Sequence, residues 1–168
     1  NDESIQELIK YADSGKIQLP DFQRGWVWDD ERIKALISSI TQNFPVGAAM
    51  FLKYGNKNIR FKYHGIEGTV LEEDTIPEAL ILDGQQRLTS IYQALFCKKP
   101  VLTKTVKGQS IKRFYYIDIE KAINPSEDML EAIISVPENK MRTENFGKDI
   151  KLDVSTEEKE FEKKLFPL

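Results

Sequence analysis

The sequence contains very little cysteine and histidine, which argues against several kinds of site. Its 168 residues include one cysteine, Cys97, and one histidine, His64. A single cysteine cannot form an internal disulfide and suits a reducing compartment, so we expect a cytoplasmic protein. Because these two residues lie far apart in the chain, neither a zinc site nor a Cys-His catalytic pair is expected.

The sequence also lacks a long apolar run and a large excess of one charge. No stretch approaches the roughly 20 apolar residues that cross a bilayer, and the first residues do not resemble a signal peptide. We therefore expect no membrane partner. The formal net charge of −3 argues against a broadly cationic DNA-wrapping surface and is compatible with a local basic cleft.

The length and composition are typical of one soluble domain. We expect a single domain over residues 1–168, with its core at about residues 4–136. The chain does not begin with methionine, and its last predicted helix stops at the apolar Phe166-Pro167-Leu168. We therefore expect this sequence to be the N-terminal fragment of a longer protein.

Hydrophobic periodicity, capping patterns and turn residues predict a mixture of helices and strands. Helices are expected over residues 5–12, 30–42 and 86–96, and from a capping box at Ser155 and Glu158 through Leu165. Strands are expected at residues 17–19, 46–52, 114–119 and 133–136, and in the apolar run before Asp83. Residues 53–78 are expected to form a hairpin and a loop.

The most informative segment is residues 79–92, where an apolar run breaks at Asp83-Gly84 and resumes with helical spacing. This pattern predicts a strand, a tight turn and a helix. Gly84 permits a sharp turn that presents the first free N–H groups of the helix to an anion. Arg87 adds a planar cation suited to phosphate, and Gln85 and Gln86 supply neutral donors and acceptors. These residues predict a phosphate cradle, unless the turn is only a common β-turn-α junction.

Two further segments lie where regular elements begin or end, namely Gln23-Arg24 and Phe44-Pro45-Val46-Gly47. Loops held by rigid elements are where ligand contacts concentrate, and two arginines reaching one point could neutralise a polyphosphate. The alternative for Arg24 is a surface ion pair with Asp29 or Asp30.

Together these segments resemble the N-terminal domain of GmrSD-type, modification-dependent restriction proteins. The resemblance is carried by residues 17–28, by the stretch from Leu36 to Val46, and by Leu82-Asp83-Gly84-Gln85-Gln86-Arg87-Leu88-Thr89. It covers residues from about 4 to 97 in the correct order, and residues 161–168 are also similar. The family is similar to ParB N-terminal and sulfiredoxin domains. That likeness implies an α+β fold with a small mixed sheet and packed helices.

The motif departs from those two relatives in an informative way. ParB-like domains carry Gly-Glu-Arg-Arg at this turn and sulfiredoxin carries Gly-Cys-His-Arg, whereas this chain keeps only Gly84 and Arg87. Gln85 stands where sulfiredoxin has its nucleophilic cysteine, so sulfinic acid reduction is not expected. The strongly charged switch of ParB is also in doubt here.

The resemblance implies a domain that binds and hydrolyses a nucleoside triphosphate with Mg²⁺, in a prokaryotic restriction or phage-defence protein. Asp83 would orient Arg87, hold the metal through water or cap the helix. Gln85 or Gln86 would orient the attacking water. The catalytic set is then Asp83, Gln85, Gln86 and Arg87, and the nucleotide-binding set is Gln23, Arg24, Pro45, Val46, Gly84 and Arg87.

The resemblance also implies partners in the full-length protein. DNA cleavage would belong to a His-Asn-His-type nuclease domain or subunit, so no nuclease activity is expected in this fragment. The alternative is a module without turnover, either a nucleotide switch or a sensor of modified DNA that regulates the nuclease. Trp26 and Trp28 are candidates for DNA or base stacking, with core packing as the other reading.

Overall fold

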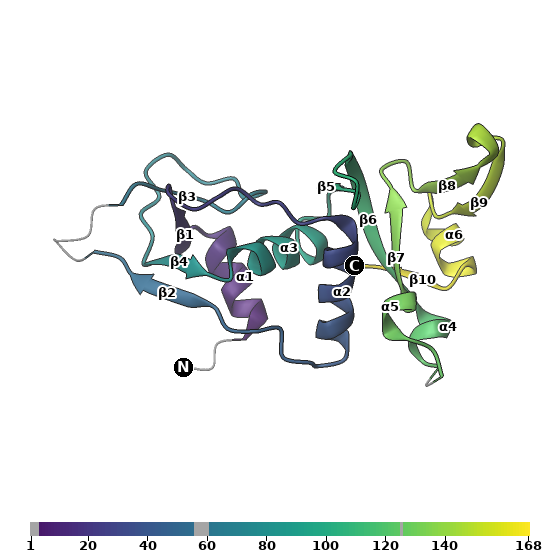
Figure 1. Ribbon diagram of the computed structural model, residues 1–168, viewed down its shortest axis with the longest axis horizontal. Coiled ribbons are helices and arrows are strands. Elements are labelled where there is room, and N and C mark those ends of the chain that lie inside the picture. Colours follow the sequence, from purple (N-terminus) through teal and green to yellow (C-terminus); the bar gives the residue numbers. More distant parts are fainter. Residues whose placement is uncertain (1–3, 56–60, 125) are drawn as a thin grey trace. The chain divides into compact units, whose positions relative to one another are not determined.

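The computed structural model describes residues 4–55, 61–124 and 126–168. Its contacts divide the chain into two compact units, and each unit combines two segments of the sequence. Unit 1 contains residues 1–27 and 47–97, and unit 2 contains residues 28–46 and 98–168. The elements of each unit are labelled in Figure 1. Both units contain helices and small sheets, which confirms the predicted α+β class. The expectation of a single domain stays a prediction.

Unit 1 is built on a four-stranded mixed sheet in the order β2-β4-β1-β3. The central strands β1 (Ile17–Pro20) and β4 (Ala79–Asp83) are parallel. The outer strands β2 (Met50–Lys53) and β3 (Tyr63–His64) are antiparallel to their neighbours. Helix α1 (Ile5–Asp13) packs against β1 and against helix α3 (Gln85–Leu95).

The core of unit 1 follows from the apolar faces of these elements. Leu80 and Ile81 of β4 are fully buried, and β1 is buried along its whole length. Helix α1 begins with the predicted capping box, in which the Ser4 hydroxyl accepts from the Glu7 N–H at 3.2 Å. In α3 the predicted inward residues Leu88, Ile91 and Tyr92 are buried, and Leu95 is half-buried.

Unit 2 is built around the long antiparallel strand β6 (Ser110–Asp118). Strand β6 pairs with β5 (Val101–Lys104), β7 (Ile133–Pro137) and β10 (Leu165–Pro167). Helix α2 (Asp30–Thr41) packs against β7 and against the short helix α5 (Met129–Ala132). The remaining elements are α4 (Ile119–Ala122), β8 (Met141–Glu144), the 3₁₀ turn η1 (Asn145–Gly147), β9 (Asp149–Asp153) and α6 (Glu157–Glu162).

A cluster of Tyr116, Val136, Val154 and Leu165 forms a hydrophobic core in unit 2. A buried polar group is satisfied beside it, because the Tyr116 hydroxyl donates to Glu160 Oε1 at 2.7 Å. Lys140 Nζ donates to the same oxygen at 3.0 Å. This pairing explains how Glu160 can be buried on a helix that the sequence predicts to be polar almost all round.

Several predicted elements need correction. The strand expected over residues 46–52 begins only at Met50, because Gly47 has a φ of 96° that an extended strand does not allow. The last helix is capped by Thr156 rather than Ser155 and ends at Glu162. Leu165 therefore lies in β10 and not in a helix, and Lys164, with a φ of 53°, turns the chain between them.

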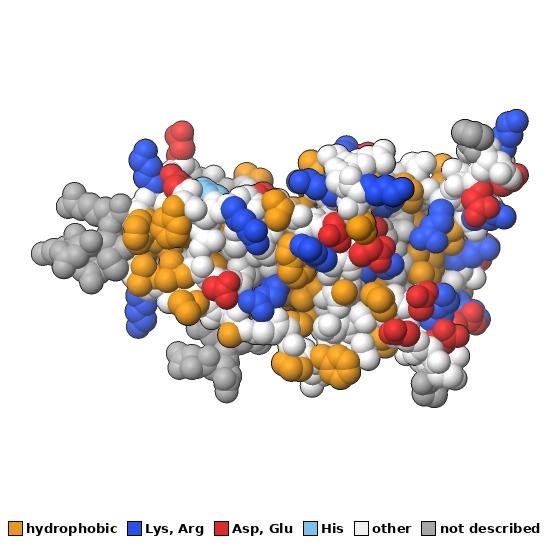
Figure 2. All heavy atoms as spheres, in the orientation of Figure 1, with side chains coloured by type: hydrophobic (Ala, Val, Ile, Leu, Met, Phe, Trp, Pro, Cys, Tyr) orange, Lys and Arg blue, Asp and Glu red, His pale blue; other side chains and the backbone are white. Residues whose placement is uncertain are grey.

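Other elements were not predicted at all, namely β5, β8, β9, α4 and α5. The hairpin expected within residues 53–78 lies partly outside the described residues, which exclude 56–60. Its described part contributes β3. Among the described residues, no helix combines the length and apolar composition that a membrane span requires. On the face of the molecule drawn in Figure 2, acidic and basic side chains are interspersed.

The stability of unit 2 is expected to depend on the ionisation of Tyr116. Burial raises the pKa of its hydroxyl to about 12, and the hydrogen bond to Glu160 acts in the same direction. An unfolded tyrosine titrates near pH 10, so this contribution is complete below about pH 10 and is lost as the pH rises towards about 12. We expect the free energy of unfolding to fall by up to about 1.4 kcal/mol per pH unit through this group.

Urea denaturation between pH 9 and pH 12 measures this dependence, with the pH range set by the two pKa values. The variant Tyr116→Phe is the control, because all other titrating groups are the same in both proteins. We expect a shallower pH dependence in the variant. Identical slopes would contradict the assignment.

Candidate functional site

The Gly84 turn joins β4 to α3 as the sequence predicts. Gly84 occupies the N-cap position with φ 89° and ψ 1°, a left-handed conformation that favours glycine. It has no side chain to cap the helix, so the first N–H groups of α3 have no partner within the helix. Asp83 makes no cap and instead lies beside Arg87, with Oδ2 3.8 Å from Nη2. Of the roles left open for Asp83, the capping one is wrong.

Arg87 connects the first turn of α3 to the backbone before β2. Its Nη2 donates to the Ala48 carbonyl oxygen at 2.6 Å. A Cβ atom at Gly47 would overlap Arg87 Nη1 and would lie 3.0 Å from Cζ. Gly47 is therefore required both by its positive φ and by the guanidinium that lies against it. The Arg87 side chain remains 28% exposed, so it can still meet a ligand.

The same backbone segment lies close to Gly84. A Cβ atom at Gly84 would be 3.1 Å from Ala49 Cβ and 3.4 Å from the Ala48 carbonyl oxygen. Strand pairing explains this approach, since Met50 of β2 lies opposite Asp83 of β4. The residues that precede β2 therefore lie next to the start of α3.

Gln85 and Gln86 hold residues 24–27 against the start of α3. The Gln85 side-chain amide is buried and donates to the Arg24 carbonyl oxygen. The Gln86 side chain donates to the Gly25 carbonyl oxygen at 3.0 Å and accepts from the Val27 N–H at 2.9 Å. We call residues 24–27 the clamped loop. Both glutamines thus satisfy the backbone groups of a loop distant in sequence.

Neighbouring side chains secure the same loop. Trp26 Nε1 donates to the Ser90 hydroxyl of α3 at 2.9 Å. The Gln23 amide donates to the Leu82 carbonyl oxygen at 2.8 Å, at the end of β4. Trp26 is half-buried, and this hydrogen bond connects the loop to the helix. The loop is therefore positioned by both elements that meet at Gly84.

Two buried oxygens of α3, Gln85 Oε1 and Thr89 Oγ1, have no hydrogen-bond partner among the described residues. They lie on the same face, one helical turn apart. Buried polar atoms in native folds are nearly always satisfied by protein, water or ligand. This pair therefore leaves room for an additional hydrogen-bond donor on the buried face of α3.

Arg24 is exposed, and its side chain forms no hydrogen bond or ion pair with the described part of the chain. The two aspartates considered as its partners pair with other arginines. Asp29 lies 3.3 Å from Arg32, and Asp30 lies 3.9 Å from Arg113. Arg24 belongs to unit 1 and both aspartates belong to unit 2, so an ion pair between them stays an open alternative.

The structure places the predicted site residues in both units. Gln23, Arg24, Trp26 and the motif of residues 83–87 belong to unit 1 and meet at the Gly84 turn. Pro45, Val46 and Trp28 belong to unit 2, so their part in this site stays a prediction. Sequence reasoning missed Ala48, since its contact is made by a backbone carbonyl that any residue supplies. The available signal was the glycine that precedes it.

The geometry defines an α+β fold with a glycine turn, at which the start of α3, which carries Arg87, meets the clamped loop, which carries Arg24. The chain belongs to the family described as GmrSD restriction endonuclease, N-terminal domain, whose sequence profile matches residues 5–167. This finding confirms the family that the sequence resembles. The likeness to ParB and sulfiredoxin domains stays a prediction, and no solved structure matches the chain significantly.

The chain is also similar to a protein of Methanocaldococcus jannaschii described as "Uncharacterized protein MJ0686". The two sequences are 31% identical over 170 residues, which cover 98% of this chain and 28% of the relative. The chain thus spans about a quarter of the length of that protein.

Replacing Gly47 by alanine should displace the Arg87 guanidinium. Gly55 is a matched control, because its φ of 102° is also positive but a Cβ atom there would meet none of the described residues within 4 Å. Both substitutions should cost about 1 kcal/mol of folding stability from the left-handed backbone. Only Gly47→Ala should shift the NMR resonances of the Arg87 guanidinium. Equal shifts in both variants would show that the Gly47 contact does not hold Arg87.

Proposed function

We propose that this chain is the nucleoside triphosphate-binding and hydrolysing domain of a prokaryotic restriction or phage-defence protein. Membership of the GmrSD N-terminal family supports the restriction context. The observation that carries the nucleotide proposal is the start of α3. There, uncapped N–H groups, a partly exposed Arg87 and the clamped loop with Arg24 occur together.

The start of α3 suits a phosphate group for two reasons. The N–H groups of Gln85 and Gln86 lie at the positive end of the helix dipole, where anions are stabilised. The hydrogen bond from Gln85 fixes the Arg24 backbone beside this helix end. The long Arg24 side chain is thereby tethered near the same point and is available for charge-assisted contacts.

Hydrolysis requires positioning and charge stabilisation more than covalent chemistry by the protein. Arg24 and Arg87 would stabilise the negative charge that develops on the phosphate oxygens. Gln86 uses both atoms of its amide group to hold the clamped loop, whereas Gln85 Oε1 has no partner among the described residues. Gln85 is therefore the better candidate for orienting the attacking water.

The residues at the Gly84 turn offer one protein ligand, Asp83, for the Mg²⁺ expected from the family resemblance. The described residues contain no group of three His, Cys, Asp or Glu side chains placed to hold a metal ion. Asp83 offers one carboxylate that is 75% exposed next to the turn. Mg²⁺ commonly takes one or two carboxylates together with water and substrate phosphates, which a single Asp83 would satisfy. The ion would supply charge neutralisation on the phosphates.

A nucleotide switch without turnover is the second candidate, and the hydrogen bonds that hold the clamped loop favour it. The side chains of the motif hold residues 24–27 and the backbone at Ala48. A ligand that competes for Arg87 or for these glutamines would therefore change how both segments are held. Such a coupling would transmit nucleotide binding to the rest of the protein without hydrolysis.

DNA and a His-Asn-His-type nuclease domain are proposed as partners of the full-length protein. The family description supports a nuclease context, and the chain covers only 28% of its longer relative. Within the described residues, the lack of a metal-binding cluster gives no support to DNA cleavage by this domain itself. Binding of modified DNA near Trp26 and Trp28 remains part of this proposal.

Arg24→Ala is the most direct test, because the exposed Arg24 side chain forms no hydrogen bond or ion pair with the described residues. The control is Arg32→Ala, an exposed arginine of α2 that forms only a surface ion pair with Asp29. We expect Arg24→Ala to weaken triphosphate binding about tenfold, as befits the loss of one charge-assisted contact. Arg32→Ala should bind normally. Calorimetry measures binding, and a phosphate-release assay measures turnover.

The two assays separate the candidate functions. Phosphate release that falls in Arg24→Ala supports hydrolysis at this site. Binding without release supports the switch. If the unmodified chain binds no nucleoside triphosphate, or if Arg24→Ala and Arg32→Ala behave alike, the assignment of this site is wrong.

A further inference from the structure

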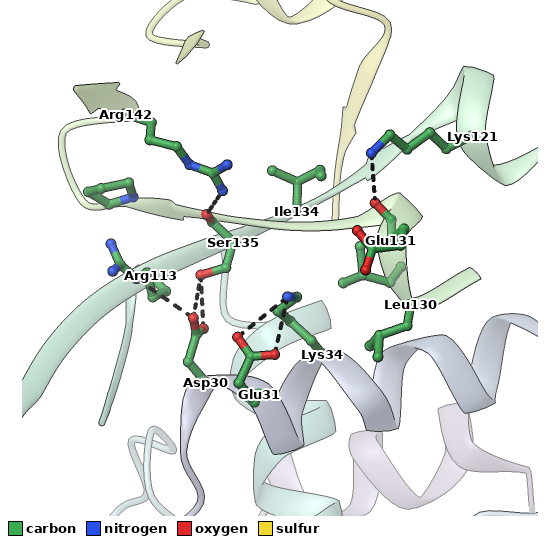
Figure 3. Close-up of a pocket in the computed structure, with 12 residues that line it drawn as sticks. Asp30, Glu31, Lys34, Arg113, Lys121, Leu130, Glu131, Ile134, Ser135 and Arg142 are labelled. Atoms are coloured by element: carbon green, nitrogen blue, oxygen red, sulfur yellow. Dashed lines mark hydrogen bonds and ion pairs between the residues drawn. The ribbon is translucent and has the colours of Figure 1, made fainter. Parts of the chain in front are cut away.

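A second concentration of charged side chains lies in unit 2, in a cavity that the proposed nucleotide site does not use. The cavity has a volume of about 330 Å³ and is lined by residues of α2, β6, α4, α5, β7 and β8 (Figure 3). Four of its lining side chains are cations, contributed by four different elements: Lys34, Arg113, Lys121 and Arg142.

Two of the three carboxylates at the cavity already have partners within the protein. Asp30 accepts hydrogen bonds from the Tyr115 hydroxyl at 2.8 Å and from the Ser135 hydroxyl at 2.8 and 2.9 Å. Glu31 pairs with Lys34 at 3.3 Å. Glu131 is the cavity carboxylate that has no partner within the described chain.

The cations, in contrast, keep unused donor capacity. The Arg142 guanidinium donates one N–H to the Ser135 carbonyl oxygen at 2.9 Å and makes no other hydrogen bond with the described residues. Within the described residues, the one hydrogen bond of Lys121 Nζ is long, at 3.5 Å to the Glu131 carbonyl oxygen. Arg113 Nε is buried with no hydrogen-bond partner in the described structure, although it lies 3.9 Å from Asp30. A buried guanidinium donor without an acceptor is costly, so an outside acceptor would be favourable here.

We propose that this cavity is an anion site that binds a phosphate group. Arg142 and Arg113 flank Ser135 on one side of the cavity, and Lys121 lies on the other (Figure 3). Guanidinium groups suit the tetrahedral oxygens of phosphate, and the lysine adds a point charge. The group could belong to a small molecule such as a mononucleotide or to a nucleic-acid backbone. The chemistry recognised is the same in both cases.

This site is independent of the Gly84 turn, because no residue of the cavity belongs to unit 1. Loss of nucleotide binding at α3 would therefore leave the anion site intact. The reverse is also expected. The two proposals can fail separately.

NMR titration of the ¹⁵N-labelled chain with inorganic phosphate, at constant ionic strength, tests the proposal. We expect the amide resonances of Ser135 and Arg142 to shift as phosphate is added. Arg142→Gln and Lys121→Gln should each weaken this response about tenfold. Neither side chain is buried in the core, so both variants should fold. Glu131→Gln should strengthen binding several-fold, because it removes the unpaired negative charge.

Lys104→Gln is the matched control, since Lys104 is an exposed lysine of the same unit outside the cavity. It should bind phosphate as the unmodified chain does. A response that is absent, that is confined to residues 84–87, or that is unchanged in both Arg142→Gln and Lys121→Gln would overturn the proposal.

Parallel titrations with a mononucleotide and with a short DNA duplex identify the source of the phosphate. Shifts of Ser135 with the mononucleotide alone indicate a small-molecule ligand. Shifts with the duplex that disappear in Arg142→Gln indicate a backbone phosphate. Either pattern supports the anion site, and a lack of response to both ligands and to inorganic phosphate overturns it.

Discussion

The close approach of the Gly47–Ala49 backbone to the first turn of α3 is the constraint on which the candidate site depends. It requires glycine at positions 47 and 84, both with positive φ, because a side chain at either would meet Arg87 or Ala49. It also fixes the direction of Arg87, whose guanidinium is held by the Ala48 carbonyl. A charged side chain that is already oriented loses less conformational entropy when it meets a ligand.

The motif combines this oriented cation with neutral side chains that act on backbone groups. The side-chain amides of Gln85 and Gln86 bond to the clamped loop. Amide groups can donate and accept at once, which carboxylates and guanidinium groups cannot do. The Gln-Gln pair thus builds a neutral frame, so the local charge comes from Arg87, Asp83 and the nearby Arg24.

Much of the local structure could be predicted from the sequence, because it is encoded by residues close together. The Ser4 capping box, the β-turn-α unit at Gly84 and the inward face of α3 each follow from local spacing. The predictions that were wrong or missing concern residues whose structure depends on partners far away in the sequence. The periodicity of the sequence predicts that Leu165 is helical, but its pairing with Asp118 of β6 places it in a strand. The contact of Arg87 with Ala48 is made to a carbonyl that carries no sequence signal.

The two segments held at the start of α3 both continue directly into the other unit. The clamped loop leads into α2 through Val27, and Gly47 receives the chain that returns from α2. Because Val27 and Gly47 are both held at the start of α3, residues 28–46 form a loop whose two ends are fixed. The loop-closure entropy has then already been lost, so α2 meets β7 and α5 as a tethered partner at high effective concentration.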